Sequence, residues 1–551
     1  MKFDYGELGY ERKSILAARK RIESFLSDKG ISLNLDTPEF HTDAVTLKEL
    51  KIAAIMDEFT FFCYQPECVL FGVSPDNFEQ ELASFQPDML FVESAWNGNH
   101  GLWKDKIAHG SKEYFALASY CHKKHIPIIF WNKEDPFHFE DFLIIAKTAD
   151  FVFTTDSDMI PQYRSRLGTN KIYHLHFAAQ PRIHNPIEIG NRQDKFCFAG
   201  AYYRCYPERA EVFERFAQVF LSTKGLAIYD REYGKRHSAY KFPSKYKPYI
   251  LGNLKADEIE KAHKGYIFGI NMNTVTSSST MFSRRVFELM ASNTVTVGNY
   301  AKGLENYFGN RTICTNDANV LIDKLENYCA TEAAVHKYRL LGLREILTAH
   351  LYEDRLSDIV KTVYNLSLKK SLPCITVISQ VQNELEYQWI IEEFKAQTYD
   401  KKQLFLFYGD ELALGTPDIS SHEHTMQSLL GDTVSSEYIA YFHPWDYYAP
   451  NYLYDLIYTL RYCDSRIIGK NAFYSITESA LHHHSGTPYC YGDNVAVRRA
   501  IINIEFVSRM TIWDFFTLNA LWGKVFYIDE WNYCENTHCV KCKDVEDMEL
   551  F

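Results

Sequence analysis

Short runs of β-branched and aromatic residues alternate along the chain with stretches of helical periodicity. The first set of runs spans residues 51–57, 89–95, 127–132, 151–156 and 171–177. The connecting segments are long enough to hold helices, and this alternation is typical of a parallel sheet covered by helices. An amphipathic, partly basic stretch at about 8–28 precedes the first run. We expect this helix to dock on the first domain rather than on a membrane, because Glu11 and Glu23 interrupt its basic face.

Two further sets of runs follow. Residues 180–194 contain two prolines, one glycine and little apolar periodicity, which predicts a linker. The second set of runs spans residues 195–202, 225–231, 266–272, 294–299 and 311–316, with helical segments from about 317 to 368. After a break at 368–374, the third set spans residues 374–380, 403–409, 438–443 and 466–475. The pattern predicts three α/β domains, at residues 1–185, 186–368 and 369–551.

Two consecutive doubly wound domains imply a binding site at the carboxyl ends of their strands, where α/β proteins bind ligands. We expect the first two domains to face each other across a cleft. This arrangement is compatible with GT-B glycosyltransferases, periplasmic-type binding proteins and some epimerases.

Composition narrows the class of protein. The 551 residues are 46% hydrophobic and 24% charged, which is typical of a globular protein. A net charge of -12 would repel a phosphate backbone, so we expect no nucleic-acid partner. The first residues lack the apolar core of a signal peptide, and no later run approaches the roughly 20 apolar residues of a transmembrane helix. These features predict a cytoplasmic protein.

The cysteines favour reduced thiols. Thirteen is an odd number scattered through a large chain, unlike a secreted disulfide framework. Cys534, His538, Cys539 and Cys542 form a cluster with some likeness to a zinc site. The second CxxC pair of a typical zinc site is absent from it, so we favour free thiols.

Residues 271–300 carry the most informative chemistry. They are expected to form a strand end, a hydroxyl-rich loop, an amphipathic helix and another strand. The apolar stripe of the helix consists of Phe282, Val286, Leu289 and Met290. Arg284, Arg285 and Glu288 then share another face, so two cations and one anion lie together.

These residue types suit a nucleoside diphosphate. We expect the hydroxyls of residues 277–280 to cap the helix, whose N-terminal N–H groups attract a diphosphate. An arginine adds charge-assisted hydrogen bonds to phosphate, and Glu288 can accept both ribose hydroxyls. The alternative is a capped surface helix with an arginine–glutamate pair at helical spacing.

Several ordered motifs resemble one family. Residues 198–216 and 283–299 resemble the nucleotide-binding half of the CgeB-type spore-maturation glycosyltransferases, which are group 1 GT-B transferases. Residues 130–142, 151–156 and 176–186 resemble the first half of the same family. The resemblance implies two Rossmann-like domains and transfer of a sugar from a nucleoside diphosphate sugar, with a UDP-sugar favoured. It implies a surface polysaccharide or protein glycan as acceptor and no metal in the GT-B site.

Carried over by position, the resemblance implies a set of donor-binding residues. They are Gly200, Arg209, Asn273, Ser283, Arg284, Arg285 and Glu288. Gly200 would let the backbone approach phosphate, Arg209 opens the following helix, and Arg285 and Glu288 take the phosphate and ribose roles. Related retaining transferases have another glutamate where this chain has Thr280. This departure leaves the stereochemistry of transfer open.

The first domain is expected to present the acceptor and any general base at its strand ends. The candidate catalytic residues are Asp57, Glu93, Glu134, Asp135 and His138. A carboxylate or imidazole within reach of the acceptor hydroxyl could deprotonate it, as an inverting mechanism requires. Trp96, His100 and Trp103 could line a sugar pocket, although packing is the commoner role of such rings.

The third domain resembles a second transferase class. Residues 372–410 resemble the opening of a family 2-type GT-A transferase, and residues 442–456 resemble its metal-site region. Only Asp446 remains of the aspartate run of that family, beside Pro444 and Trp445. One carboxylate is a poor ligand set for a divalent cation. We expect a degenerate domain that binds acceptor, positions the other domains or forms a homodimer.

The leading hypothesis is a glycosyltransferase with no cofactor besides its nucleotide-sugar substrate. A rival of another class is a noncatalytic glycan-binding or scaffold protein. A second enzyme alternative is a GT-B-shaped sugar-nucleotide epimerase, which would convert the donor without an acceptor.

Overall fold

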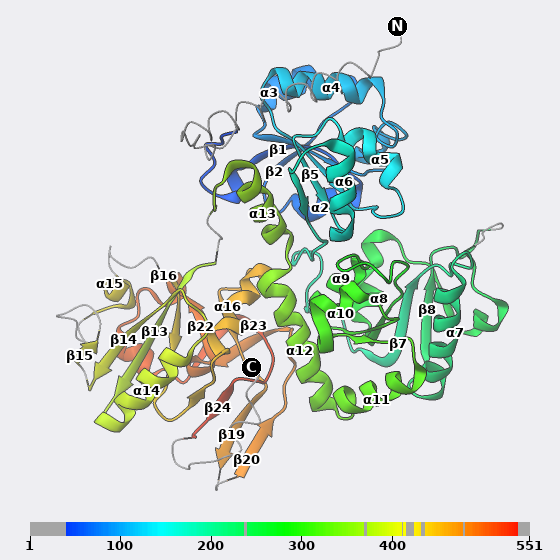
Figure 1. Ribbon diagram of the computed structural model, residues 1–551. Helices are drawn as coiled ribbons and strands as arrows, with labels where there is room; N and C mark the ends of the chain where they lie inside the picture. Colours follow the sequence, from blue (N-terminus) through cyan, green and yellow to red (C-terminus); the bar gives the residue numbers. More distant parts are fainter. Residues whose placement is uncertain are drawn as a thin grey trace, which may run out of the picture. The chain divides into compact units, whose positions relative to one another are not determined.

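The computed structural model describes residues 40–235, 240–368, 372–409, 411–414, 424–430, 436–477 and 480–537. Contacts divide the chain, drawn in Figure 1, into two compact units. The first contains residues up to Phe177 together with Ser277–Met281 and Tyr352–Lys369, and the second contains the rest. The helix expected at 8–28 lies outside the described residues.

The first unit is built on a sheet of six parallel strands in the order β2-β1-β3-β4-β5-β6. These strands are β1 (Lys51–Ile55), β2 (Val69–Gly72), β3 (Met89–Glu93), β4 (Ile128–Asn132), β5 (Phe151–Thr154) and β6 (Ile172–His174). Strands β2 and β3 lie on opposite sides of β1, so the strand order reverses there. This topological switch point is the usual ligand site of such sheets.

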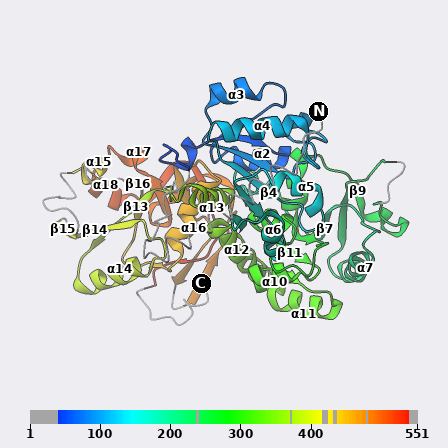
Figure 2. The same ribbon diagram turned by 45° about the horizontal axis from the view of Figure 1, so that its top comes forward.

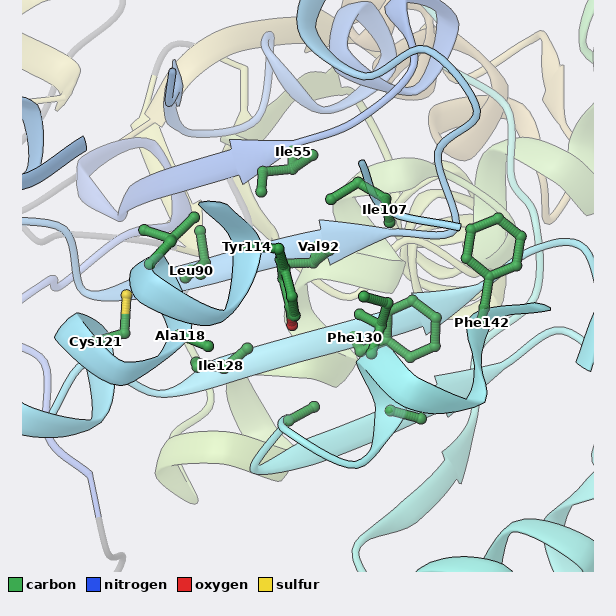
Figure 3. Close-up of a cluster of buried hydrophobic side chains, with 14 of the residues drawn as sticks. Ile55, Leu90, Val92, Ile107, Tyr114, Ala118, Cys121, Ile128, Phe130 and Phe142 are labelled. Atoms are coloured by element: carbon green, nitrogen blue, oxygen red, sulfur yellow. The ribbon is translucent and has the colours of Figure 1, made fainter. Parts of the chain in front are cut away.

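Helices cover both faces of this sheet. They are α2 (Glu58–Tyr64), α3 (Phe78–Phe85), α4 (Lys112–Lys123), α5 (Phe139–Ala146), α6 (Ile160–Leu167) and α13 (Tyr352–Tyr364). Helices α3 and α4 lie side by side (Figures 1 and 2). Figure 3 shows Leu90 and Phe130 of the strands against Tyr114 of α4 and Phe142 of α5, all within one buried cluster. Strands buried on both faces explain their near-continuous apolar sequence.

Helix α13 corrects the predicted domain boundary. We expected residues up to 368 to close the second domain, but α13 packs on the first. Its buried stripe consists of Leu356, Ile359, Val360 and Val363, at helical spacing. Tyr352 stands edge-on to Tyr64 of α2, with ring centroids 4.8 Å apart, and the Tyr364 hydroxyl donates to the Asp88 carbonyl over 2.7 Å. Periodicity predicted the helix, but not the sheet that its stripe covers.

The second domain has another sheet of six parallel strands, in the order β12-β11-β10-β7-β8-β9. They are β7 (Gln193–Gly200), β8 (Leu226–Asp230), β9 (Ile250–Gly252), β10 (Tyr266–Asn271), β11 (Val295–Gly298) and β12 (Ile313–Cys314). Its switch point lies between β7 and β10. The α/β class with two Rossmann-like domains is therefore confirmed, although short, partly exposed β2 and β9 were not predicted.

The helices of this domain pack on the second sheet. They are α7 (Pro207–Ser222), α8 (Glu260–Lys264), α9 (Arg285–Ala291), α10 (Lys302–Phe308), α11 (Ala318–Cys329) and α12 (Glu332–Ala349). Helix α11 packs beside α7 (Figures 1 and 2). Helix α9 lies so close to β10 that a Cβ added at Gly269 would come within 2.5 Å of the Leu289 side chain. This close approach fixes the helix that carries Arg285.

The third domain has an eight-stranded mixed sheet, in the order β15-β14-β13-β16-β22-β18-β23-β21, and a four-stranded sheet, β17-β24-β19-β20. The first sheet contains β13 (Cys374–Val381), β14 (Lys402–Tyr408), β15 (Glu411–Leu414), β16 (Ser436–Tyr441), β18 (Ile467–Gly469), β21 (Tyr491–Ala496), β22 (Ala500–Asn503) and β23 (Ala520–Tyr527). The second contains β17 (Tyr447–Tyr448), β19 (Phe473–Thr477), β20 (Ala480–His484) and β24 (Tyr533–Glu535). The helices are α14 (Glu384–Ala396), α15 (Met426–Leu430), α16 (Tyr452–Tyr458), α17 (Ile504–Val507) and α18 (Ile512–Thr517). The single strand predicted at 466–475 is wrong, because its halves are β18 and β19 of different sheets.

A buried ion pair and a histidine–carboxylate contact join α12 to the third domain. Arg344 of α12 donates to both carboxylate oxygens of Asp455 on α16, over 2.9 and 2.8 Å. His336 lies 3.0 Å from Glu530. These contacts explain why the second and third predicted domains form one compact unit. Among the described residues, no helix is long and apolar enough to cross a membrane.

Candidate active site

Three arginines gather at the switch point of the second sheet. Arg209 of α7 and Arg231, directly after β8, both lie over the ring of Tyr203, at 4.7 and 5.9 Å. The Arg285 guanidinium lies 5.6 Å from the ring centroid of Phe198, on β7. Within the described residues, none of the three forms an ion pair with a carboxylate. The site is therefore strongly cationic.

The charges of these arginines oppose one another. Burial, and then the charge of Arg285, lowers the pKa of Arg209 to about 10. Burial also lowers the pKa of Arg285, against the attraction of Glu288, and Arg231 lowers it further. Like charges held together in a partly desolvated site favour an anionic ligand. A diphosphate supplies the required negative charge and several acceptor oxygens.

Gly200 ends β7 beside these arginines. A Cβ added there would lie 3.0 Å from the ring of Phe198 and 3.5 Å from Nη2 of Arg285. The ring of Phe198 therefore leaves little room for a side chain at this position, and the Arg285 guanidinium lies within van der Waals range of it. This is the place that the sequence assigned to Gly200, next to Arg209 and Arg285.

Glu288 is buried and ionised. Its side chain is 8% exposed and lies 3.1 Å from the Arg284 guanidinium. Burial alone would raise the pKa of Glu288, but Arg284 and then His184 hold it below its usual value. The surface helix of the alternative is wrong, because all of α9 after Arg285 is buried, but the arginine–glutamate pair of that alternative is present between Arg284 and Glu288. A carboxylate in this position, one turn beyond Arg285, is compatible with the predicted binding of the ribose hydroxyls, which stays a prediction.

Two other predicted donor residues have internal partners. Asn273 is 2% exposed, and its Oδ1 accepts from the backbone N–H of Ser283 over 3.0 Å. The Asn273 N–H donates to Oδ1 of Asn299 over 2.6 Å. Ser283 in turn accepts from the Arg285 N–H over 3.4 Å. Asn273 and Ser283 therefore position the start of α9, and their predicted contact with the donor stays a prediction.

The predicted cap of α9 is wrong. The helix begins at Arg285, and its N-cap residue Arg284 makes no side-chain cap. The Ser278 hydroxyl instead donates to Asp156 over 2.7 Å, and the Ser279 N–H donates to Asp158 over 2.9 Å. Residues 277–281 therefore belong to the first unit. The hydroxyls of Ser278 and Thr280 and the N–H of Ser279 bond to groups after β5, which local sequence spacing did not reveal.

Asp57 and Glu93 share one cation at the switch point of the first sheet. Lys133, after β4, lies 3.1 Å from Asp57 and 3.0 Å from Glu93. Glu93 is fully buried and accepts from the Thr60 hydroxyl and the Asp57 N–H over 2.5 and 2.8 Å. Although burial opposes the charge of Lys133, Glu93 and Asp57 raise its pKa. This buried network holds the strand ends together.

Glu134 and Asp135 differ in accessibility. Asp135 is 1% exposed and accepts from the Thr154 hydroxyl, the Asn132 amide and the Tyr163 hydroxyl. Burial raises the pKa of Asp135 to about 7. Glu134 is partly exposed, and burial raises its pKa. No group within the described residues hydrogen-bonds to the Glu134 carboxylate.

His138 precedes α5 and is paired with a carboxylate. Its Nδ1 lies 2.7 Å from Oδ2 of Asp141, and its side chain is 42% exposed. The ring stands edge-on to Trp96, with centroids 4.9 Å apart. Trp96 is 37% exposed, whereas Trp103 is fully buried and donates to the Val73 carbonyl. Of these tryptophans, Trp96 alone is placed to meet a ligand.

The third domain offers a poor metal site. Asp446 is fully buried, lies 3.3 Å from the Arg498 guanidinium and accepts from the Tyr533 hydroxyl over 2.7 Å. Burial raises the pKa of Asp446 to about 6. A divalent cation at this carboxylate would face the guanidinium, so the residues do not fit the metal of GT-A transferases. His538, Cys539 and Cys542 lie outside the described residues, where the sequence placed a weak zinc cluster.

Three residues of these sites were not predicted. Arg231 and Tyr203 complete the cationic site, and Lys133 joins Asp57 to Glu93. Arg231 is the last residue of the strand predicted at 225–231, and Lys133 lies in a motif used for the family resemblance. Their positions at strand ends were the available signal.

Comparison with known proteins finds a family match within the second domain. Residues 223–361, which include Arg231, Arg285 and Glu288, match the family described as Glycosyl transferase-like. Spore protein CgeB of Bacillus subtilis (strain 168) is 24% identical over 224 residues, covering 38% of this chain and 63% of that protein. The chain thus spans less than two thirds of this curated relative. The predicted resemblance to CgeB is confirmed, and residues 223–361 carry the expected likeness to glycosyltransferases.

Two solved structures resemble part of the chain. A variant of S. aureus TarM, described in complex with Fondaparinux, alpha-GlcNAc-glycerol and UDP, has 11% identity and a TM-score of 0.34. That likeness covers 50% of this chain and 55% of the other. The N-terminal domain of Candida albicans trehalose-6-phosphate phosphatase has 8% identity and a TM-score of 0.35, covering 53% of this chain and 73% of the other.

Proposed function

We propose that this protein is a glycosyltransferase that moves a sugar from a nucleoside diphosphate sugar, with a UDP-sugar as first choice, to a glycan or protein acceptor in the cytoplasm. The group of three arginines at Gly200 carries the proposal. Like charges gathered at a switch point are stabilised by a bound diphosphate. The resemblance to CgeB supports a spore or cell-surface glycan as acceptor.

In this proposal the arginines stabilise the leaving diphosphate. Negative charge grows on the diphosphate as the bond to the sugar breaks, and positioned cations stabilise that charge without reorganising. Glu288 would accept the ribose hydroxyls, supported by its lowered pKa and its place one turn after Arg285. No metal ion is needed for this step, because the guanidinium groups supply the positive charge.

A thermal-shift screen with UDP, GDP, CMP and TDP tests the donor site. We expect at least one nucleotide to raise the Tm of the chain, and Arg285→Ala to abolish that shift and turnover with the fold intact. Mass spectrometry after incubation with a panel of sugar nucleotides then identifies donor and acceptor. A response to none of the nucleotides would favour a scaffold, and donor conversion without acceptor would favour an epimerase.

In this proposal the third domain is a noncatalytic part of the enzyme. The ion pair between Asp446 and Arg498 supports this role, because it occupies the carboxylate expected to bind metal. A homodimer through this domain is supported by the exposed rings of Trp522 and Phe506, at 71% and 42% exposure. Light scattering of the chain and of Trp522→Ser tests the dimer.

A further inference from the structure

We propose that His138 is the general base for transfer, that Asp141 orients it, and that Trp96 supports the sugar ring of a glycan acceptor. This inference rests on the proposed function, and the three residues that carry it all lie in the first unit. It selects one of five candidate bases and assigns the acceptor to carbohydrates.

His138 has the arrangement expected of a base. Its Nδ1 is bonded to Oδ2 of Asp141 over 2.7 Å, which fixes the orientation of the ring. With the proton on Nδ1, the lone pair lies on Nε2, and within the described residues no group hydrogen-bonds to Nε2. The side chain is 42% exposed, so a hydroxyl can reach it. The other oxygen of Asp141, Oδ1, lies 3.5 Å from Nε2 of His109.

Three of the other candidates have carboxylates that are already engaged by several hydrogen bonds and ion pairs. Glu93 and Asp135 are fully buried and accept three or more hydrogen bonds or ion contacts each. Asp57 accepts from the N–H groups of Asn97 and Gly98, each over 3.0 Å, and pairs with Lys133. Asp57 therefore holds the loop after β3 in place through these hydrogen bonds.

Glu134 is the remaining competitor. It is partly exposed but lacks a partner that would orient its carboxylate. A base must point its lone pair at the hydroxyl during attack, and a third group usually secures that direction. His138 has such a group in Asp141, whereas Glu134 does not.

Trp96 provides a flat apolar surface beside His138. Its backbone N–H donates to Asp57 over 3.3 Å, which fixes the loop. Its indole stands edge-on to His138 and to Phe142, with centroid distances of 4.9 and 5.1 Å. Figure 3 shows Phe142 within the buried core of this domain, so the indole rests on a rigid base. The C–H face of a pyranose packs well on such a ring.

The chemical step balances in protons and electrons. Nε2 of His138 takes the proton of the acceptor hydroxyl, and Asp141 stabilises the resulting imidazolium. The acceptor oxygen forms a bond to C1 of the donor sugar as the bond from C1 to the diphosphate breaks. The electron pair leaves with the diphosphate, and the imidazolium later returns its proton to solvent. Direct displacement inverts the configuration at C1.

Chemical rescue tests the base. We expect His138→Ala to lower kcat by roughly 100- to 10,000-fold, with the nucleotide-induced Tm shift unchanged. Imidazole added to this variant should restore turnover, which a purely structural role would not allow. His122→Ala is the matched control, because His122 is an exposed histidine 3.8 Å from Asp150 in the same domain. It should keep full activity.

The partners of His138 have their own variants. Asp141→Asn should lower kcat with little change in KM. Asp141→Glu, which keeps a carboxylate, should have a kcat between those of Asp141→Asn and the unchanged chain. Trp96→Ala should raise the KM for a glycan acceptor by roughly tenfold, whereas Trp96→Phe keeps most of the platform. NMR of the product should show inversion at C1.

The outcomes separate this inference from the proposed function. If the wild-type chain transfers sugar but His138→Ala is equally active, or if Glu134→Gln alone abolishes turnover, the assignment of the base is wrong. Retention at C1 overturns it as well. If the wild-type chain transfers no sugar from any donor, the proposed function fails, and this inference fails with it.

Discussion

Replacing Arg209 by methionine should stabilise the ligand-free protein and weaken nucleotide binding. Burial and neighbouring cations lower the pKa of Arg209 to about 10. A fall of this size corresponds to about 3 kcal/mol of unfavourable free energy for the charged side chain in the folded state. The cation–π contact of Arg209 with the Tyr203 ring, at 4.7 Å, stabilises the folded protein by about 1 kcal/mol. Methionine removes both effects and keeps much of the volume, so we expect a net gain of about 1–2 kcal/mol.

Binding should change in the opposite direction. Arg209→Met removes a charge-assisted hydrogen bond to phosphate, worth about 1.5–3 kcal/mol. The Kd of the preferred nucleoside diphosphate should therefore rise roughly 10- to 100-fold. Calorimetry gives the Tm of the ligand-free protein, and titration calorimetry gives the Kd.

Arg215→Met is the control on the same helix. Arg215 is exposed, and within the described ranges its side chain donates only to the Asn316 carbonyl, over 3.3 Å. This variant should leave the Kd unchanged. An Arg209→Met variant that loses stability and binds nucleotide normally would refute the reasoning, because the arginines would then be structural.

Three further predictions concern the ion pairs and the metal. Arg344→Met should lower the free energy of unfolding, measured by chemical denaturation, by about 3–5 kcal/mol, because Asp455 is then buried without its cation. The double variant Arg344→Met, Asp455→Leu should recover most of this free energy. Lys133→Met should cost a similar amount near pH 7. Burial raises the pKa of Asp57, but Lys133 and backbone N–H groups lower it below its usual value. The ionised Asp57 therefore stabilises the folded protein at pH values above the pKa that Asp57 has in the unfolded chain, and this stabilisation is lost as the pH falls through the folded-state pKa. The deficit of Lys133→Met should therefore shrink below about pH 4, and a deficit that grows there contradicts the charge argument. EDTA should leave turnover unchanged, and a loss that Mg²⁺ or Mn²⁺ restores would contradict the proposal of a metal-independent site.

Local periodicity predicted much of the fold. The strand runs that became β1, β3 and β10 were recognisable because parallel strands buried on both faces are largely apolar. The stripe of α9 was predicted for the same reason, including Val286 and Leu289. The short strands β2 and β9 were missed, since few apolar residues mark them.

The candidate sites were only partly predictable. Arg285 and Glu288 were found because their spacing along one helix is visible in the sequence. Arg231 and Lys133 were missed because each joins its site from a different strand end. The hydroxyls of residues 277–280 were assigned to the nearest helix, although their partners lie more than 100 residues away.

The sequence by itself determined which segments form strands and helices, and which residues of each element are apolar. These properties depend on neighbours within one or two turns of the chain. Only the tertiary structure decided that β1 lies between β2 and β3, that α13 covers the first sheet, and that three arginines converge at Gly200. Strand order places groups side by side that are far apart in sequence, and the electrostatic energy of a site depends on those distances in space.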